Sequence, residues 1–245
     1  MKPERIIDFR YAPSHAQVCI GLVDDPDKTI VRTDGSVNWG YNWVNYYRMY
    51  NDEHAVLTAD ERNRGFTYRV KPVLLHRDEL LSSVQDHGKA SAAIVTTTED
   101  YKASVLTWKT FAWRTEQDAR VDVILWSMTA KDNFITTRSG VSLQSMGHTD
   151  GLPVILHTPR VKTVSVSDEP LPFFHAGETM EGAYFIVQEG KMDPAEATLD
   201  TAKKALAWAE NYWDNVTPFV NKFVIPEKQI ADMLAACGRN ILQAR

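Results

Sequence analysis

The fold is decided by residues 101–130, YKASVLTWKTFAWRTEQDARVDVILWSMTA. From 101 to 115, β-branched and aromatic side chains alternate along the chain, with Leu106 and Trp108 on one face and Val105 and Thr107 on the other. This alternation is typical of a long β-strand. The turn-like EQDA follows, and residues 120–130 alternate again. The two segments together predict an antiparallel hairpin.

Both predicted strands carry apolar side chains on both faces. In the second strand the residues at 121, 123 and 125 are apolar, and Ile124 and Trp126 add apolar groups to the opposite face. A strand that is apolar on both faces is expected between two layers of structure and not against water. The strand tryptophans are therefore predicted to be core residues: Trp108, Trp113 and Trp126.

Strand patterns recur through most of the chain. Tight-turn dipeptides such as Asp34-Gly35 and Asp150-Gly151 separate them. Many strands with short turns and no helical repeats between them predict a mainly β protein, a large antiparallel β-sandwich. The further strand candidates are residues 16–23, 65–75, 91–98, 140–146, 153–158, 160–167 and 182–188.

Helical patterns begin near Asp193. Asp193 suits an N-cap, and Pro194 suits the first helical position. Apolar residues then recur every three or four positions, which predicts an amphipathic helix to about Trp213. We expect two domains, a β-sandwich over 1–192 and a linker helix with the start of a helical region over 193–245. The apolar positions of the linker helix are Leu199, Ala202, Leu206, Ala209 and Trp213.

The last segment, IPEKQIADMLAACGRNILQAR over 225–245, predicts a second C-terminal helix opened by Pro226. One side of this helix is apolar, and no later residue of the chain is left to cover it. The stripe is therefore expected either to pack back on the sandwich or to bind a helical domain or another chain. Its residues are Ile230, Met233, Leu234, Cys237, Ile241 and Leu242.

Composition limits the classes of partner. The chain has 245 residues, a net charge of −5 and a pI near 5.8, so no basic surface predicts binding to nucleic acid. The N-terminus MKPERIIDFRYAP lacks the apolar core of a signal peptide, and no stretch is long enough to span a bilayer. These features predict a soluble protein without a membrane partner.

The sequence predicts neither a cofactor nor a metal site. Cys19 and Cys237 lie at opposite ends of the chain and form no ligand cluster, so both are expected to be small core residues. The histidines show no metal-binding spacing. Most acidic residues fall in turn-like segments, where we expect solvated side chains; examples are Asp24, Asp25 and Asp27 in DDPDK.

Residues 38–54, NWGYNWVNYYRMYNDEH, concentrate aromatic rings among asparagines. Flat rings beside amide groups suit sugars, whose C–H faces stack while their hydroxyls form hydrogen bonds. The alternative is an aromatic cover over a sheet edge or a surface that docks on another domain. The candidate carbohydrate-binding residues are Trp39, Trp43, Tyr46 and Tyr47.

The order of these elements resembles the N-terminal half of the six-hairpin glycoside hydrolases. The resemblance rests on residues 9–37, the strands WKTFAW (108–113) and RVDVILWSM (120–128), the helix AENYWDNV (209–216) and IPEKQIADML (225–234). It implies a galactose-mutarotase-like supersandwich, a linker and an α/α barrel. In that group the catalytic carboxylates lie in barrel loops, and the resemblance implies that this chain stops inside what would be the first barrel helix. The resemblance therefore identifies no catalytic residue here.

Three interpretations of function remain open. The first is a non-catalytic N-terminal β-sandwich of a carbohydrate-active glycoside hydrolase, which supports the barrel and contacts an oligosaccharide or polysaccharide. The second is a stand-alone carbohydrate-binding module. The third is a structural protein whose C-terminal helices dock on a homo-oligomer or on another subunit.

Overall fold

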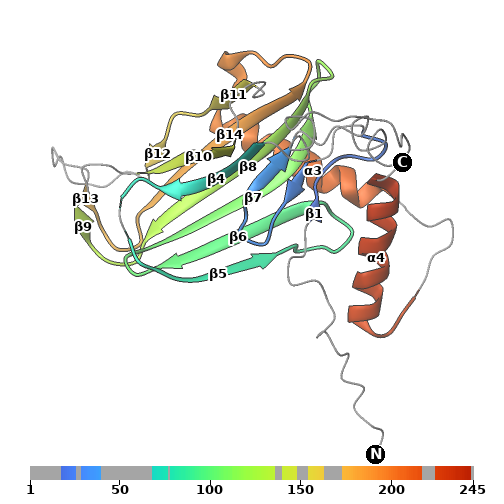
Figure 1. Ribbon diagram of the computed structural model, residues 1–245, viewed down its shortest axis with the longest axis horizontal. Coiled ribbons are helices and arrows are strands. Elements are labelled where there is room, and N and C mark those ends of the chain that lie inside the picture. Colours follow the sequence, from blue (N-terminus) through green and yellow to red (C-terminus); the bar gives the residue numbers. More distant parts are fainter. Residues whose placement is uncertain are drawn as a thin grey trace, which may run out of the picture.

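The computed structural model describes residues 18–25, 29–39, 68–76, 78–135, 140–147, 154–162, 173–216 and 224–243. Within these ranges the chain is mainly β, with two antiparallel sheets followed by two C-terminal α-helices (Figure 1). The predicted fold class, a large antiparallel β-sandwich with two C-terminal helices, is confirmed.

The smaller sheet is built largely from the first half of the chain. The predicted segments 65–75 and 140–146 form its longest strands, whereas of the described residues 18–23 two are in a strand. Neighbouring strands pair antiparallel throughout. Its order is β1 (Val18–Cys19), β2 (Ile30–Val31), β3 (Val37–Trp39), β4 (Tyr68–Leu74) and β10 (Val141–Gly147).

The larger sheet contains the predicted hairpin at its centre. Ser104 lies opposite Ala130 and Arg114 opposite Arg120, which confirms the antiparallel pairing. The path of this sheet is β11 (Val154–His157), β14 (Thr179–Glu189), β8 (Arg120–Ala130), β7 (Ser104–Arg114), β6 (Ile94–Tyr101) and β5 (Leu80–Asp86). In addition, β12 (Val161–Lys162) pairs with β14, while β9 (Phe134–Ile135) and β13 (Phe173–Phe174) form a separate ribbon.

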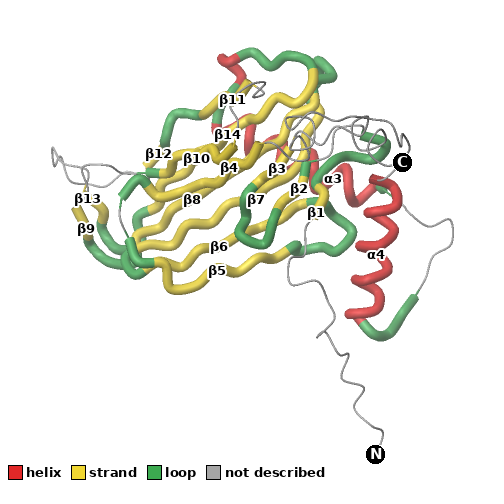
Figure 2. The backbone as a smooth tube through the Cα atoms, viewed as in Figure 1, coloured by secondary structure: helices red, strands yellow, loops and turns green. Residues whose placement is uncertain are grey.

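Strand β5 has no counterpart among the predicted strands. It forms an outer edge of the larger sheet (Figure 2) and leaves Leu80, Leu81 and Val84 exposed. Because an edge strand does not need one buried and one solvated face, its sequence ELLSSVQD lacks the alternation that marks the central strands.

The space between the sheets is filled by one face of the hairpin. Trp108 and Trp126 are buried there, together with Leu106 and Ile124, against Val70 and other residues of the smaller sheet. The opposite face of the hairpin also lies in a core, so the prediction of a strand pair between two layers is confirmed. Trp113, the third strand tryptophan, is only half-buried.

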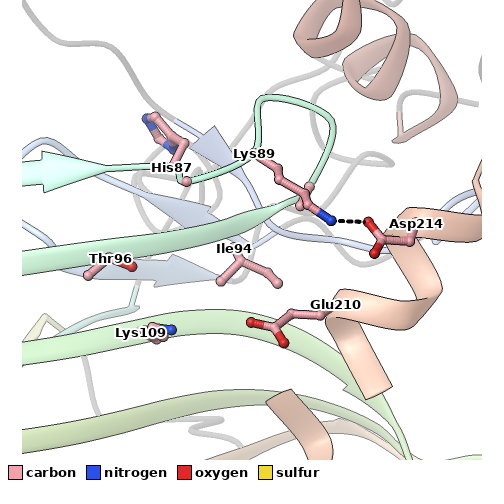
Figure 3. A pocket seen from close by; sticks show the side chains of 9 residues that line it. His87, Lys89, Ile94, Thr96, Lys109, Glu210 and Asp214 are labelled. Atoms are coloured by element: carbon pink, nitrogen blue, oxygen red, sulfur yellow. Dashed lines mark hydrogen bonds and ion pairs between the residues drawn. The ribbon is translucent and has the colours of Figure 1, made fainter. Parts of the chain in front are cut away.

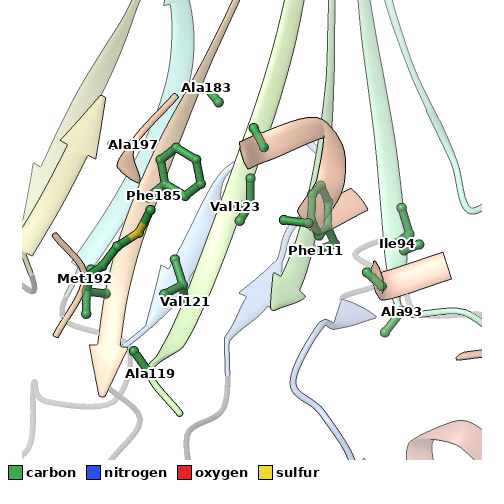
Figure 4. Packing of buried hydrophobic residues seen from close by; sticks show 14 of the residues in the cluster. Ala93, Ile94, Phe111, Ala119, Val121, Val123, Ala183, Phe185, Met192 and Ala197 are labelled. Atoms are coloured by element: carbon green, nitrogen blue, oxygen red, sulfur yellow. The ribbon is translucent and has the colours of Figure 1, made fainter. Parts of the chain in front are cut away.

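Helix α3 (Leu199–Asn215) covers that opposite face (Figure 4). Its Ala202, Ala205, Ala209 and Trp213 are buried and belong to one core with Phe111, Val123 and Phe185 of the sheet. The small alanines allow the helix to approach the strands closely. The molecule thus has three layers: smaller sheet, larger sheet and α3.

The predicted start of the linker helix is wrong by one short turn. Asp193 and Pro194 open the 3-10 helix η2 (Pro194–Glu196), which ends at the non-helical backbone of Ala197. The α-helix then begins at Leu199, with Thr198 as its N-cap. Among the described residues, no helix is both long and apolar enough to cross a membrane.

Candidate functional site

The segment predicted to bind sugar lies almost entirely outside the described residues. Trp43, Tyr46 and Tyr47 fall outside them, and Trp39 is described only as the last backbone position of β3. Their role in carbohydrate binding stays a prediction. The described surface with the clearest functional character is instead helix α4 (Lys228–Gln243), which stands at one end of the sandwich (Figure 1).

Helix α4 is attached to the sandwich through Arg239. This side chain is 5% exposed, and its Nη1 donates hydrogen bonds to the carbonyl oxygens of Ala90 (3.0 Å) and Ala92 (2.9 Å). Both carbonyls lie in the β5–β6 connection. A charged donor satisfying two backbone acceptors is a strong and directional contact, so it sets the position of the helix on the sandwich.

Gln243 makes a second attachment one turn further along α4. Its side-chain amide is buried and donates to the carbonyl oxygens of Cys19 (3.1 Å) and Gly21. The backbone N–H of Asp24 in turn donates to the carbonyl oxygen of Leu242 at 3.3 Å. Helix α4 therefore bridges the β5–β6 connection and the segment after β1, two regions far apart in sequence.

The apolar stripe of α4 faces away from these attachments. The buried residues of the helix are Gly238, Arg239 and Gln243. Arg239 and Gln243 lie on the side opposite Ile230, whereas Gly238 lies between Leu234 and Leu242 at the border of the stripe. Of the two alternatives expected for the stripe, packing back on the sandwich holds at most for Leu242, which is half-buried, while the other stripe residues are exposed. The prediction that Cys237 is a core residue is wrong, because Cys237 is exposed. The exposed fractions of the stripe are 41% for Ile230, 59% for Met233, 39% for Leu234 and 65% for Ile241.

A pocket of about 370 Å³ lies where the β5–β6 connection, β6, β7 and α3 meet (Figure 3). Lys89 reaches across to α3 and forms a 2.6 Å ion pair with Asp214. Glu210, one turn earlier on α3, extends toward the strand that carries Lys109 (Figure 3). His87 lines the same pocket beside the connection that anchors Arg239.

His87 has an unusual environment for a residue near the surface. Burial lowers its pKa, the nearby Arg239 cation lowers it further, and Asp86 opposes the shift only in part. Its Nδ1 is buried and has no hydrogen-bond partner among the described residues. The side chain is thus held neutral near the Arg239 attachment, where a second positive charge would be unfavourable.

The two carboxylates that α3 contributes to this pocket do not have the arrangement of a hydrolytic pair. Glu210 and Asp214 project from one face of the same helix, whereas a hydrolytic pair must flank a sugar from two sides. Asp214 is also occupied by Lys89. Within the described part of the chain, no group of three or more His, Cys, Asp or Glu residues could hold a metal ion. We assign no catalytic role to these residues.

A buried charge cluster, which the sequence patterns did not predict, joins the segment after β1 to the larger sheet. Asp25, expected to be a solvated turn residue, is 2% exposed and accepts a hydrogen bond from the fully buried Arg120, which also contacts Asp122 at 2.6 Å. Thr29 and Gln188 complete the cluster by donating to Asp122 at 2.5 and 2.7 Å. The available signal was two charged residues, Arg120 and Asp122, inside an otherwise apolar strand.

This cluster is structural. Burial lowers the pKa of Arg120, but the carboxylates of Asp122 and Asp25 outweigh this effect and hold the pKa above its ordinary value. The guanidinium therefore remains charged and ties the segment after β1 to strand β8. That segment also contains the carbonyl of Gly21, which binds Gln243 of α4.

Comparison of the chain with protein-family models, with curated proteins and with solved structures finds no match.

Proposed function

We propose that this chain is a non-catalytic β-sandwich that supports a helical domain, and that helix α4 is the surface on which that domain docks. The supporting observation is the orientation of α4. Its polar and small side chains, including Arg239 and Gln243, contact the sandwich, while Ile230, Met233 and Ile241 face outward. A helix normally buries its apolar face, so this arrangement favours a partner on the outer side.

The spacing of the exposed side chains favours another helix as the occupant. Ile230, Met233, Leu234, Cys237 and Ile241 recur every three or four residues and form a narrow stripe along α4. Such a stripe matches the ridges and grooves by which two helices pack side by side. Covering each large side chain would contribute about 1.5–3 kcal/mol relative to full exposure.

The wider assignment follows the resemblance to six-hairpin glycoside hydrolases. In that group a β-sandwich and a linker helix precede an α/α barrel, and α4 corresponds to the first barrel helix. We propose that the helical domain is such a barrel and that any hydrolysis of glycosides takes place there. The sandwich then positions the barrel and contributes no reacting group.

Cys237 provides a direct test because it lies in the exposed stripe. In a Cys19→Ser variant, Cys237 is the remaining cysteine and reports on the accessibility of α4. We expect the chain alone to react rapidly with iodoacetamide. The same chain extended by the helical segment of its parent gene should react about tenfold more slowly or less. A Met233→Asp change should restore rapid labelling, whereas Lys204→Ala, on the distant helix α3, should not.

Several outcomes contradict the proposal. A parent gene without helical hairpins after residue 245 removes the proposed occupant. Dimerisation of the chain alone, abolished by Met233→Asp in sedimentation experiments, assigns the stripe to a second copy and supports a structural role. Turnover of aryl glycosides by the purified chain itself contradicts a non-catalytic sandwich.

A further inference from the structure

A second groove lies between helix α3 and the turn that joins β7 to β8. It has a volume of about 570 Å³, within the range of roughly 300–1,000 Å³ typical of small-ligand sites. One wall comes from the end of β7 and its turn, with Trp113, Glu116 and Gln117. The other wall comes from η2 and the first half of α3, with Glu196 and Trp208.

The helical wall follows from the periodicity of α3. Thr201, Lys204, Ala205 and Trp208 are spaced by three, one and three residues, so they share one face of the helix. Ala205 is small and buried, which leaves room between its larger neighbours. Trp208 is half-buried: it lines the groove and also packs against the core beneath α3.

Both indole rings are held in place before any ligand arrives. Trp208 stacks on Tyr212 with ring centroids 5.1 Å apart and an interplanar angle of 16°. Tyr212 is itself fixed, because its hydroxyl accepts a 3.0 Å hydrogen bond from the backbone N–H of Val23. Trp113 packs against Phe185 at 6.3 Å. Preorganised rings lose little conformational freedom when a ligand stacks on them.

The β7–β8 turn that forms the rim is equally well ordered. The backbone N–H of Thr115 donates to the carbonyl oxygen of Ala119 at 2.9 Å, and Asp118 donates back to Thr115 at 3.0 Å. The Thr115 hydroxyl accepts from the N–H of Ala119 at 3.0 Å. Arg114 also reaches the carbonyl oxygen of Asp118 at 3.2 Å. This turn therefore presents Glu116 and Gln117 from a defined backbone.

The two cations that line the groove already have partners, because Arg114 pairs with Asp118 at 3.0 Å and Lys204 with Asp200 at 2.7 Å. The carboxylates of Glu116 and Glu196 also line the groove. Among these lining residues the groove offers an anionic ligand no uncompensated cation, whereas its two carboxylates can accept hydrogen bonds from the hydroxyl groups of a ligand.

We infer that this groove binds a carbohydrate chain, with Trp113 and Trp208 stacking on sugar rings and Glu116, Gln117 and Glu196 forming hydrogen bonds to hydroxyl groups. Within the described residues, these three polar side chains make no hydrogen bond or ion pair that would compete with a ligand. Indole rings beside amide and carboxylate groups match the alternating C–H faces and hydroxyl edges of a pyranose. This site is separate from α4 and does not depend on docking there.

The test is binding of neutral hexasaccharides to the full chain, measured by isothermal titration calorimetry and by tryptophan fluorescence. The probes are maltohexaose, cellohexaose, xylohexaose, mannohexaose and chitohexaose, with choline as a cationic probe. We expect at least one hexasaccharide to bind. Trp208→Ala should weaken that binding by about tenfold or more, and Trp208→Phe by less.

Two further variants separate binding from folding. The double variant with Glu116→Gln and Glu196→Gln alters only exposed side chains. It should weaken hexasaccharide binding without changing the melting temperature of the protein. Lys203→Ala, on another face of α3, should leave binding unchanged.

Absence of binding to every hexasaccharide at about 10 mM overturns the inference, as does binding unaffected by Trp208→Ala. Binding of choline in place of sugar assigns the groove to cations. Met233→Asp on α4 should leave sugar binding intact, so failure of the docking proposal is distinguished from failure of this one.

Discussion

The indole nitrogen of Trp108 donates a 3.1 Å hydrogen bond to the carbonyl oxygen of Gly35, joining the larger sheet to the turn between β2 and β3. Gly35 has a φ of +72°, and a Cβ at this position would clash with Cζ2 of Trp108. The turn therefore needs glycine for two reasons, its left-handed backbone and the closeness of the indole. This contact fixes the spacing of the two sheets.

Replacing Gly35 with alanine should destabilise the sandwich by about 3 kcal/mol or more, because backbone strain and overpacking against Trp108 add. Gly177→Ala is the matched control. Gly177 has a φ of +88°, but beyond its chain neighbours a Cβ there would meet no atom of the described residues within 4 Å, so only the strain of about 1–2 kcal/mol is expected. Urea unfolding of both variants measures the difference. Equal losses of unfolding free energy in the two variants would show that overpacking against Trp108 adds nothing to the backbone strain.

Removing the buried cation of the charge cluster should be strongly destabilising. Arg120→Met leaves Asp25 and Asp122 buried without their partner, and a loss of about 3–5 kcal/mol is expected. Arg114→Met, the position directly opposite in the hairpin, removes an exposed pair with Asp118 and should cost about 1 kcal/mol or less. Thermal unfolding of the two variants compares them, and similar losses would contradict a structural role for the cluster.

Acidification should destabilise the fold through His87 and His76. Burial lowers the pKa of each below the ordinary value of 6.5, with Arg239 adding to the effect at His87. Between the folded pKa and 6.5 the unfolded chain binds more protons, so the stabilisation is complete above pH 6.5 and decreases as the pH falls. Unfolding free energies at about pH 7 and pH 5 should differ less in His87→Gln than in the parent chain. An NMR titration that places the pKa of His87 above 6.5 would contradict the prediction.

The attachment of α4 should depend on Arg239. Arg239→Met leaves the carbonyl oxygens of Ala90 and Ala92 without this donor, so α4 should separate more often from the sandwich. Hydrogen exchange should accelerate over residues 228–243 while the β7–β8 hairpin stays protected. Lys228→Met, which removes only an exposed pair with Asp232, is the control and should leave exchange unchanged. Unchanged exchange in Arg239→Met would show that other contacts hold the helix.

The central strands were predictable because their burial requires apolar residues at neighbouring positions, which is a local sequence pattern. A strand covered on both faces is expected to be apolar on both faces, and β8 has that property over most of its length, with Arg120 and Asp122 as charged exceptions. Helix α3 was predictable for the same reason, since its buried residues recur at helical spacing. The edge strand β5 was not, because its exposed side chains are under no such constraint.

The candidate sites were less accessible to sequence reasoning. The groove between Trp113 and Trp208 unites residues that are far apart in the chain, and each tryptophan alone is equally typical of a core. The segment 38–54 is distinctive in composition, but the side chains of residues 39–54 lie outside the described residues. Asp25 resembles a turn residue in the sequence because its partner, Arg120, is contributed by a distant strand.

The sequence by itself determined the mainly β architecture, the hairpin at its centre, the two C-terminal helices and the existence of an apolar stripe on the second of them. Each of these follows from periodicity, which is a local property of the chain. Only the tertiary structure decided which side of α4 touches the sandwich. That choice depends on Arg239 and Gln243 finding backbone carbonyl oxygens contributed by residues 19–21 and 90–92. Hydrogen bonds to backbone groups far away in the chain produce no periodic pattern in the sequence. In this protein they orient α4 so that its apolar stripe faces outward.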